Sequence, residues 1–238
     1  MPSPNSFFPE FPLNWEMSVA EQFTLVGLLE RTRPEVAIEI GTHFGGSLQV
    51  LDKFCGRVHS IDVDPEVRAQ LASRFERVCF HTGSSRELIP RVLSEIEQGG
   101  GKLGFILVDG DHTAAGVQAD IEVLLRHRPK GPLNIVLHDS FNPDCRAGMR
   151  RAAWGGSPYV HAVDLDFVTG TFHATATGGA FARSMWGGFA LAVLHPEPRI
   201  GPLQVRESQA SMQQLVFRHS AHRLWHKVLR AVRQRLSR

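Results

Sequence analysis

Short apolar runs alternate with amphipathic stretches along most of this chain. Five runs rich in Val, Ile, Leu and Phe predict buried strands at 35–40, 57–62, 77–81, 104–109 and 133–138. The stretches between them have helical spacing and predict helices at 46–54, 65–75, 84–98 and 114–127. This alternation predicts an α/β fold, a Rossmann-like doubly wound parallel sheet with helices on both faces.

The same pattern extends beyond this central region in both directions. Residues 18–32 have helical spacing and begin with Ser18 and Glu21 in the arrangement of a capping box. Two further apolar runs, 159–169 and 186–195, bring the predicted sheet to about seven strands. The Gly-, Ala- and Thr-rich stretch between them predicts a mobile loop.

The first strand leads into a glycine-rich turn, VAIEIGTHFGG, which is followed by a helix start. Glycines let such a turn approach a ligand closely, and the helix offers free N–H groups. A dinucleotide fingerprint has a glycine where His43 stands, so another nucleotide ligand is favoured. The spacing Glu-x-Gly-x-x-x-Gly resembles the first motif of class I S-adenosylmethionine (SAM) methyltransferases, although a purely structural turn remains the alternative. The cofactor-binding residues predicted here are Glu39, Gly41, Thr42, Gly45 and Gly46.

The next two strands end in further candidates for a nucleoside site. Asp62 is placed to accept hydrogen bonds from both ribose hydroxyls, unless it caps the next helix, for which Asp64 is the better candidate. Gly83, Ser84 and Ser85 are small enough to admit an adenine ring, and a serine hydroxyl can bond its edge. A simple helix N-cap is the alternative for these serines.

Acids and histidines follow the fourth and fifth strands. Parallel strands bring their carboxyl ends to one edge, so the side chains of this group are expected to converge: Asp109, Asp111, His112, His138 and Asp139. Several like charges in one crevice need a counter-cation. A divalent metal ion or the SAM sulfonium would supply one.

Taken in order, EIGTHFGGS, SIDVDP, GSSRELIP, ILVDGDH and HDS resemble the catechol O-methyltransferase-like group over residues 35–195. The bacterial branch that methylates sugars and macrolides is the more similar. The resemblance implies a last hairpin inserted antiparallel, a SAM cofactor and a hydroxyl acceptor of sugar or natural-product type.

The resemblance also implies roles for the convergent side chains. Asp109 and Asp139 match Mg²⁺ ligands, but the third ligand would be His138 or Ser140, neither of which suits Mg²⁺ well. His112 stands where the group keeps a basic residue and could take the acceptor proton. Alternatively, His112 caps the following helix or bonds Asp139.

Charge and cysteine content add the remaining expectations. Of the 26 Lys and Arg residues, seven lie in 218–238 without an acid, which leaves 19 against 24 acids elsewhere. We expect an N-terminal cap segment and helix (1–34), a SAM-binding domain (35–200) and a basic amphipathic C-terminal helix (201–238). That helix could contact a membrane surface or a second subunit in a homo-oligomer. The acidic body argues against nucleic acid, and three scattered cysteines predict a cytoplasmic protein.

The leading hypothesis is a SAM-dependent O-methyltransferase. A nicotinamide-dependent oxidoreductase on a similar sheet and a non-catalytic SAM-binding or scaffold protein are the alternatives. Aromatic-rich segments 1–20, 141–158 and 170–185 are expected on the acceptor side of the site.

Overall fold

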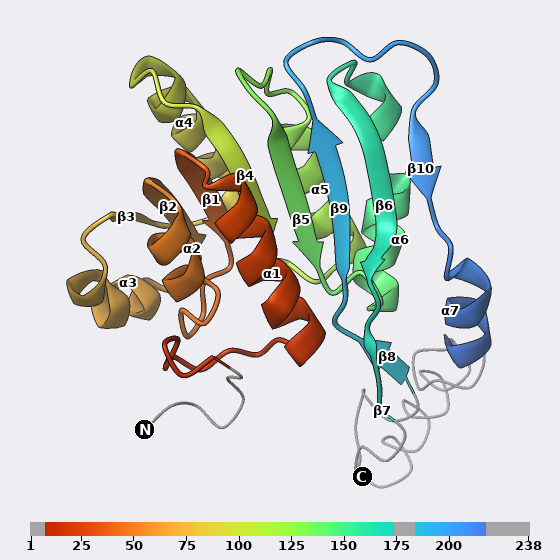
Figure 1. Cartoon of the computed structure of the whole chain (residues 1–238), viewed down its shortest axis with the longest axis horizontal. Helices are drawn as coiled ribbons and strands as arrows, with labels where there is room; N and C mark the ends of the chain where they lie inside the picture. The colour runs from red at the N-terminus through yellow and green to blue at the C-terminus, as the bar shows by residue number, and fades with distance from the viewer. Residues whose placement is uncertain (1–7, 174–183, 218–238) are drawn as a thin grey trace, which may run out of the picture.

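The structure, a computed structural model, describes residues 8–173 and 184–217. Its main sheet has the strand order β10-β6-β9-β5-β4-β1-β2-β3, and helices cover both faces (Figure 1). The strands of this sheet are β1 (Val36–Ile40), β2 (Arg57–Asp62), β3 (Val78–Thr82), β4 (Leu103–Val108), β5 (Leu133–His138), β6 (Val160–Val168), β9 (Phe189–Leu194) and β10 (Gln204–Arg206). The helices are α1 (Val19–Thr32), α2 (Leu48–Phe54), α3 (Pro65–Leu71), α4 (Ser85–Gln98), α5 (Ala114–Leu124), α6 (Pro143–Arg151) and α7 (Ala210–Phe217), with 3₁₀ turns η1 (Ala72–Arg74) and η2 (Trp154–Gly156).

The first five strands are parallel and lie close to their predicted ranges. All five residues of β1 are buried, because helices pack on both sides of it. Ile38 belongs to the core beneath α4, α5 and α6, whereas Ala37 belongs to the core beneath α1, α2 and α3. The predicted doubly wound α/β fold is confirmed.

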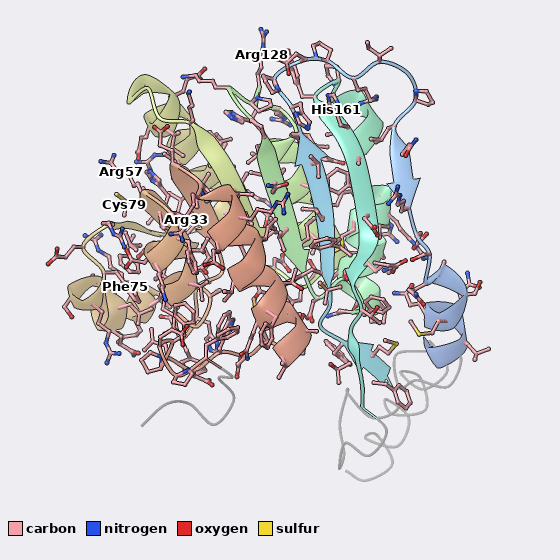
Figure 2. The ribbon with its side chains drawn as sticks, in the orientation of Figure 1. Arg33, Arg57, Phe75, Cys79, Arg128 and His161 are labelled. Carbon is pink, nitrogen blue, oxygen red and sulfur yellow. The ribbon has the colours of Figure 1, made fainter. Side chains whose placement is uncertain are left out.

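The last hairpin is antiparallel, as the resemblance implied. Strand β9 lies between β5 and β6 and is antiparallel to both. Strand β6 therefore runs in the direction of β1–β5 and begins at their amino edge, where Figure 2 shows Arg128 and His161. A classic dinucleotide-binding sheet has a parallel sixth strand beside the fifth, so this order disfavours the oxidoreductase alternative.

Two predicted segments differ from the observed elements. The loop expected over 170–185 begins and ends in regular structure, because β7 (Thr171–His173) and β8 (Ser184–Trp186) pair as a separate two-stranded sheet. The segment assigned to a helical tail first forms β10, which pairs with β6, and becomes helical at Ala210. The basic stretch 218–238 lies outside the described residues, so the three-part division stays a prediction.

Helix α6 was not predicted, although its start carries a clear signal. Asn142 caps it by accepting a hydrogen bond from the Asp144 amide at 3.0 Å, and Pro143 follows at the first helical position. The capping box predicted for α1 is present, with both reciprocal bonds between Ser18 and Glu21. Within the described ranges, every helix is too short or too polar to cross a membrane.

Candidate active site

A cavity of about 1250 Å³ opens at the carboxyl edge of the parallel strands. It is bounded by the turns after β1 to β5 and by the segment that precedes α1. Most of the predicted site residues line it: Gly41, Thr42, Gly46, Asp62, Gly83, Ser84, Ser85, Asp109, Asp111, His112, His138 and Asp139. Glu39, Gly45 and Ser140 are not among the lining residues.

The glycine turn is shaped by the packing of the chain on itself. Gly41 has a φ of +84°, and a Cβ there would lie 2.0 Å from the Asp109 carbonyl oxygen. A Cβ on Gly46 would lie 2.3 Å from the Asn14 carbonyl oxygen. These two glycines therefore allow β4 and the N-terminal segment to approach the turn, which brings residues of both to the cavity wall.

Glu39 supports this turn from below. Its side chain is fully buried and accepts hydrogen bonds from Thr42 Oγ1 at 2.7 Å and Ser47 Oγ at 2.6 Å. Burial raises the pKa of Glu39 to about 7, against the effect of these two donors. Its position fits a role in holding the turn, rather than direct contact with a ligand in the cavity.

Asp62 joins the ends of β1 and β2. Its Oδ2 accepts hydrogen bonds from the Thr42 amide at 2.9 Å and the His43 amide at 3.0 Å. Asp64 caps α3 through the Glu66 amide at 2.9 Å, so the neighbouring residue fills the capping role. Asp62 thus remains at the cavity wall, fixed by the turn that precedes it.

Val63 and Asp120 line the same side of the cavity and were not predicted. Val63 is 72% exposed, which leaves an apolar face beside Asp62. Asp120 is almost fully buried; its Oδ1 accepts a hydrogen bond from Ser85 Oγ at 2.7 Å, and its Oδ2 has no partner. Burial raises the pKa of Asp120. Ser84 occupies the N-cap position of α4 without a side-chain capping bond, so its hydroxyl does not make the alternative contact.

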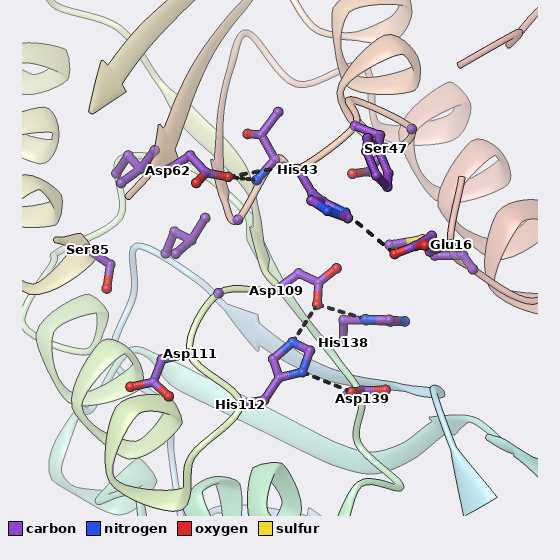
Figure 3. Close-up of a pocket in the computed structure, with 18 of the residues that line it drawn as sticks. Glu16, His43, Ser47, Asp62, Ser85, Asp109, Asp111, His112, His138 and Asp139 are labelled. Atoms are coloured by element: carbon purple, nitrogen blue, oxygen red, sulfur yellow. Dashed lines mark hydrogen bonds and ion pairs between the residues drawn. The ribbon is translucent and has the colours of Figure 1, made fainter. Parts of the chain in front are cut away.

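His112 lies between the two acids predicted as metal ligands (Figure 3). Its Nε2 is 3.2 Å from Asp109 Oδ1, and its Nδ1 is 3.3 Å from Asp139 Oδ2. The hydrogen bond to Asp109 and the charges of both acids raise the pKa of His112, although partial burial opposes them. Of the alternatives for His112, the contact with Asp139 is present. The other alternative, that His112 caps the following helix, is wrong, because Thr113 caps α5.

A second imidazole stands behind the first. His138 Nδ1 is 2.8 Å from Asp109 Oδ1, and its Nε2 is 3.0 Å from Glu21 Oε1. Burial opposes a charge on His138, but Asp109 and Glu21 hold its pKa well above the usual range. Burial likewise opposes a charge on Asp109, yet the two histidines lower its pKa to about 2.

Two consecutive glycines, in the turn between β8 and β9, complete this cluster. The Gly187 amide donates to Asp139 Oδ1 at 2.7 Å, and the Gly188 amide donates to Glu21 Oε1 at 2.6 Å. Both glycines have positive φ. Glu21 was assigned only a capping role from its sequence position, and no local signal connects it with His138, 117 residues later.

The donor set is a poor match for Mg²⁺. In the described part of the chain, two groups of three metal-capable side chains have ligand atoms within 4.8 Å of one another, and Asp109 is in neither. One group is His112, Asp139 and Cys145, of which only Asp139 offers the oxygen ligand that Mg²⁺ prefers. The other group, His59, His81 and Glu95, lies away from the cavity on β2, β3 and α4.

The acceptor side differs in part from the prediction. Trp15 and Trp186 line the cavity. No residue of 141–158, all of which are described, does so. The reason is topological, because α6 carries the chain back to the amino edge, where β6 has to begin.

Comparisons with known proteins find a related domain and related folds. Residues 38–140 match a family model described as a methyltransferase domain. An O-methyltransferase from Bacillus cereus, solved in complex with SAH, is 21% identical, with 75% of this chain and 82% of that one covered and a TM-score of 0.53. The O-methyltransferase TomG from Streptomyces achromogenes, solved with SAM, is 17% identical, with coverage of 79% and 83% and a TM-score of 0.51.

A third solved structure, cofactor-bound Rv0187 from MTB, is 23% identical, with coverage of 78% and 84% and a TM-score of 0.51. The search of curated proteins finds no match. The predicted resemblance to class I SAM-dependent methyltransferases is confirmed, since residues 38–140 match a methyltransferase-domain model.

Proposed function

We propose that this protein transfers the methyl group of SAM to a hydroxyl of a small polyhydroxylated or glycosylated molecule. The observation that carries the proposal is that one cavity joins the Gly41 turn and Asp62 to the His112–Asp139 pair. At about 1250 Å³ the cavity exceeds the ~1,000 Å³ upper range of ordinary ligand sites, which supports a cofactor and an acceptor side by side. The solved O-methyltransferases of this fold, with SAH or SAM bound, agree with this reading.

The nucleoside half of SAM fits the wall between β2 and α5. Asp62 is placed to accept hydrogen bonds from the ribose hydroxyls, and Val63 offers an apolar face to the adenine ring. The free Oδ2 of Asp120 is an acceptor suited to the adenine amino group. A buried acceptor without a partner is costly, so a donor from a ligand would stabilise it.

His112 is the proposed general base. Asp139 Oδ2 lies 3.3 Å from its Nδ1, while Nε2 is 3.2 Å from an Asp109 oxygen that His138 already contacts at 2.8 Å. The acceptor hydroxyl can therefore replace Asp109 at Nε2. Bound SAM supplies an electrophilic methyl carbon; His112 takes the hydroxyl proton at Nε2 as the oxygen bonds that carbon and the thioether leaves. Alignment of the reacting atoms by the cavity supplies much of the rate.

Calorimetric titration with S-adenosylhomocysteine tests the cofactor site. We expect micromolar binding to the wild type and at least about tenfold weaker binding to Asp62→Asn. Asp64→Asn is the matched control, because it makes the same change two residues away and asparagine is an equally good N-cap. Absence of binding to the folded wild type would overturn the proposal.

A panel of hydroxylated acceptors, with O-methyl products detected by mass spectrometry, tests the reaction. His112→Ala should lower kcat by about 10²–10⁴ and leave the affinity for S-adenosylhomocysteine nearly unchanged. If His112→Ala instead leaves the protein's function intact, the scaffold alternative is favoured. Contact of the basic tail with a membrane or a second subunit, and a cytoplasmic location, remain predictions.

A further inference from the structure

A buried histidine, His138, lies inside the acidic cluster. His138 is 9% exposed in its side chain, and each of its ring nitrogens faces a carboxylate oxygen, Asp109 at 2.8 Å and Glu21 at 3.0 Å. Nδ1 hydrogen-bonds Asp109, whereas Nε2 lies at ion-pair distance from Glu21 without hydrogen-bond geometry. Two carboxylates this close to one ring favour the charged form of the imidazole.

Glu21 is built into this arrangement rather than lying near it by chance. Only 2% of the residue is exposed. Oε1 accepts a hydrogen bond from the Gly188 amide at 2.6 Å and lies 3.0 Å from His138 Nε2, and Oε2 accepts a hydrogen bond from the Ser18 amide at 2.6 Å. The start of α1, the end of β5 and the turn before β9 thus hold this carboxylate against the imidazole. A backbone donor at each oxygen favours the charged form of the carboxylate.

The remaining acids lack the geometry for a shared divalent ion. Two oxygens bound to one Mg²⁺ at about 2.1 Å lie no more than about 4.2 Å apart, with nothing between them. Here the ring of His112 separates Asp109 from Asp139, with one nitrogen toward each (Figure 3). Asp139 Oδ1 is also taken by the Gly187 amide. Ser140 is fully buried and does not line the cavity, so it cannot supply the third ligand.

We propose that His138, held by Glu21 and Asp109, occupies the place of the divalent cation, and that methyl transfer here proceeds without a metal ion. This rests on the proposed function. The proton of the acceptor passes to His112 and the methyl group passes from sulfur to oxygen, so no further reactant is needed. Without a metal to chelate, the acceptor requires a single hydroxyl rather than two adjacent oxygens.

The test uses electron paramagnetic resonance to measure Mn²⁺ binding to the EDTA-treated full chain, with and without S-adenosylhomocysteine. We expect the wild type to bind no Mn²⁺ at micromolar concentrations. One-to-one micromolar binding that is lost in Asp109→Asn would overturn the proposal. This result can be read whether or not S-adenosylhomocysteine binds, so a failure of the proposed function is recognised separately.

A gain of metal binding provides the reciprocal test. His138→Asp removes the cation and adds a carboxylate beside Asp109 and Glu21, so the folded variant should bind Mn²⁺ and be stabilised by it against heat. His161→Asp makes the same change on a half-buried histidine at the amino edge of the sheet and should gain neither property. A folded His138→Asp protein that gains no Mn²⁺ affinity contradicts the assignment; if it does not fold, the wild-type measurement decides alone.

Discussion

Glu39 should make the stability of the protein depend on pH. Its pKa is raised from 4.5 to about 7 because the carboxyl is buried beneath the glycine turn. In the unfolded chain the carboxyl loses its proton near pH 4.5, whereas in the folded state it holds the proton to about pH 7. Below pH 4.5 the carboxyl is protonated in both states and does not affect the free energy of unfolding. As the pH rises from 4.5 through 7, this group lowers the free energy of unfolding. A shift of about 2.5 pKa units corresponds to about 3 kcal/mol.

The variant Glu39→Gln removes this titration and keeps the shape of the side chain. Urea unfolding at about pH 4 and about pH 8 gives the free energy of unfolding of the variant and of the wild type. The variant's advantage over the wild type should be up to about 3 kcal/mol larger at the higher pH. Glu76→Gln, on an exposed side chain, is the matched control and should show no such change. If the difference between Glu39→Gln and the wild type is the same at both pH values, the carboxyl is charged when buried and the reasoning is wrong.

Three further predictions follow from other contacts. Gly41→Ala should lower the free energy of chemical unfolding by at least about 3 kcal/mol, because the new Cβ would meet the Asp109 carbonyl at 2.0 Å and the φ is +84°. A loss below about 1 kcal/mol would contradict this. Arg146→Met should lower the free energy of unfolding by about 3–5 kcal/mol, because it removes the ion-pair partner, now 2.7 Å away, of the buried Asp166 carboxylate; unchanged stability would contradict this. The pH profile of kcat/KM should have a rising limb above the ordinary histidine pKa of 6.5, because Asp109 raises the pKa of His112; a limb below 6.5 would exclude His112 as the base.

Much of the fold could be predicted from the sequence because its cause is local. A parallel strand buried on both faces has to be apolar throughout, and the turns and caps between strands depend on neighbouring residues. Asp64 and Ser18 show this, since each caps the helix that immediately follows it. The convergence of Asp109, His112 and Asp139 was also predictable, because parallel strands end at one edge.

The tertiary structure alone decided how those groups are paired. Glu21 reaches His138 across 117 residues, and Asp120 presents a free oxygen beside Ser85 from a different helix. Such contacts depend on how helices pack on the sheet, which no local pattern encodes. The sequence by itself determined that acids and histidines meet at one edge of the sheet; the packing of α1 against β5 and β9 determined that Glu21 and Asp109 flank the buried His138 imidazole.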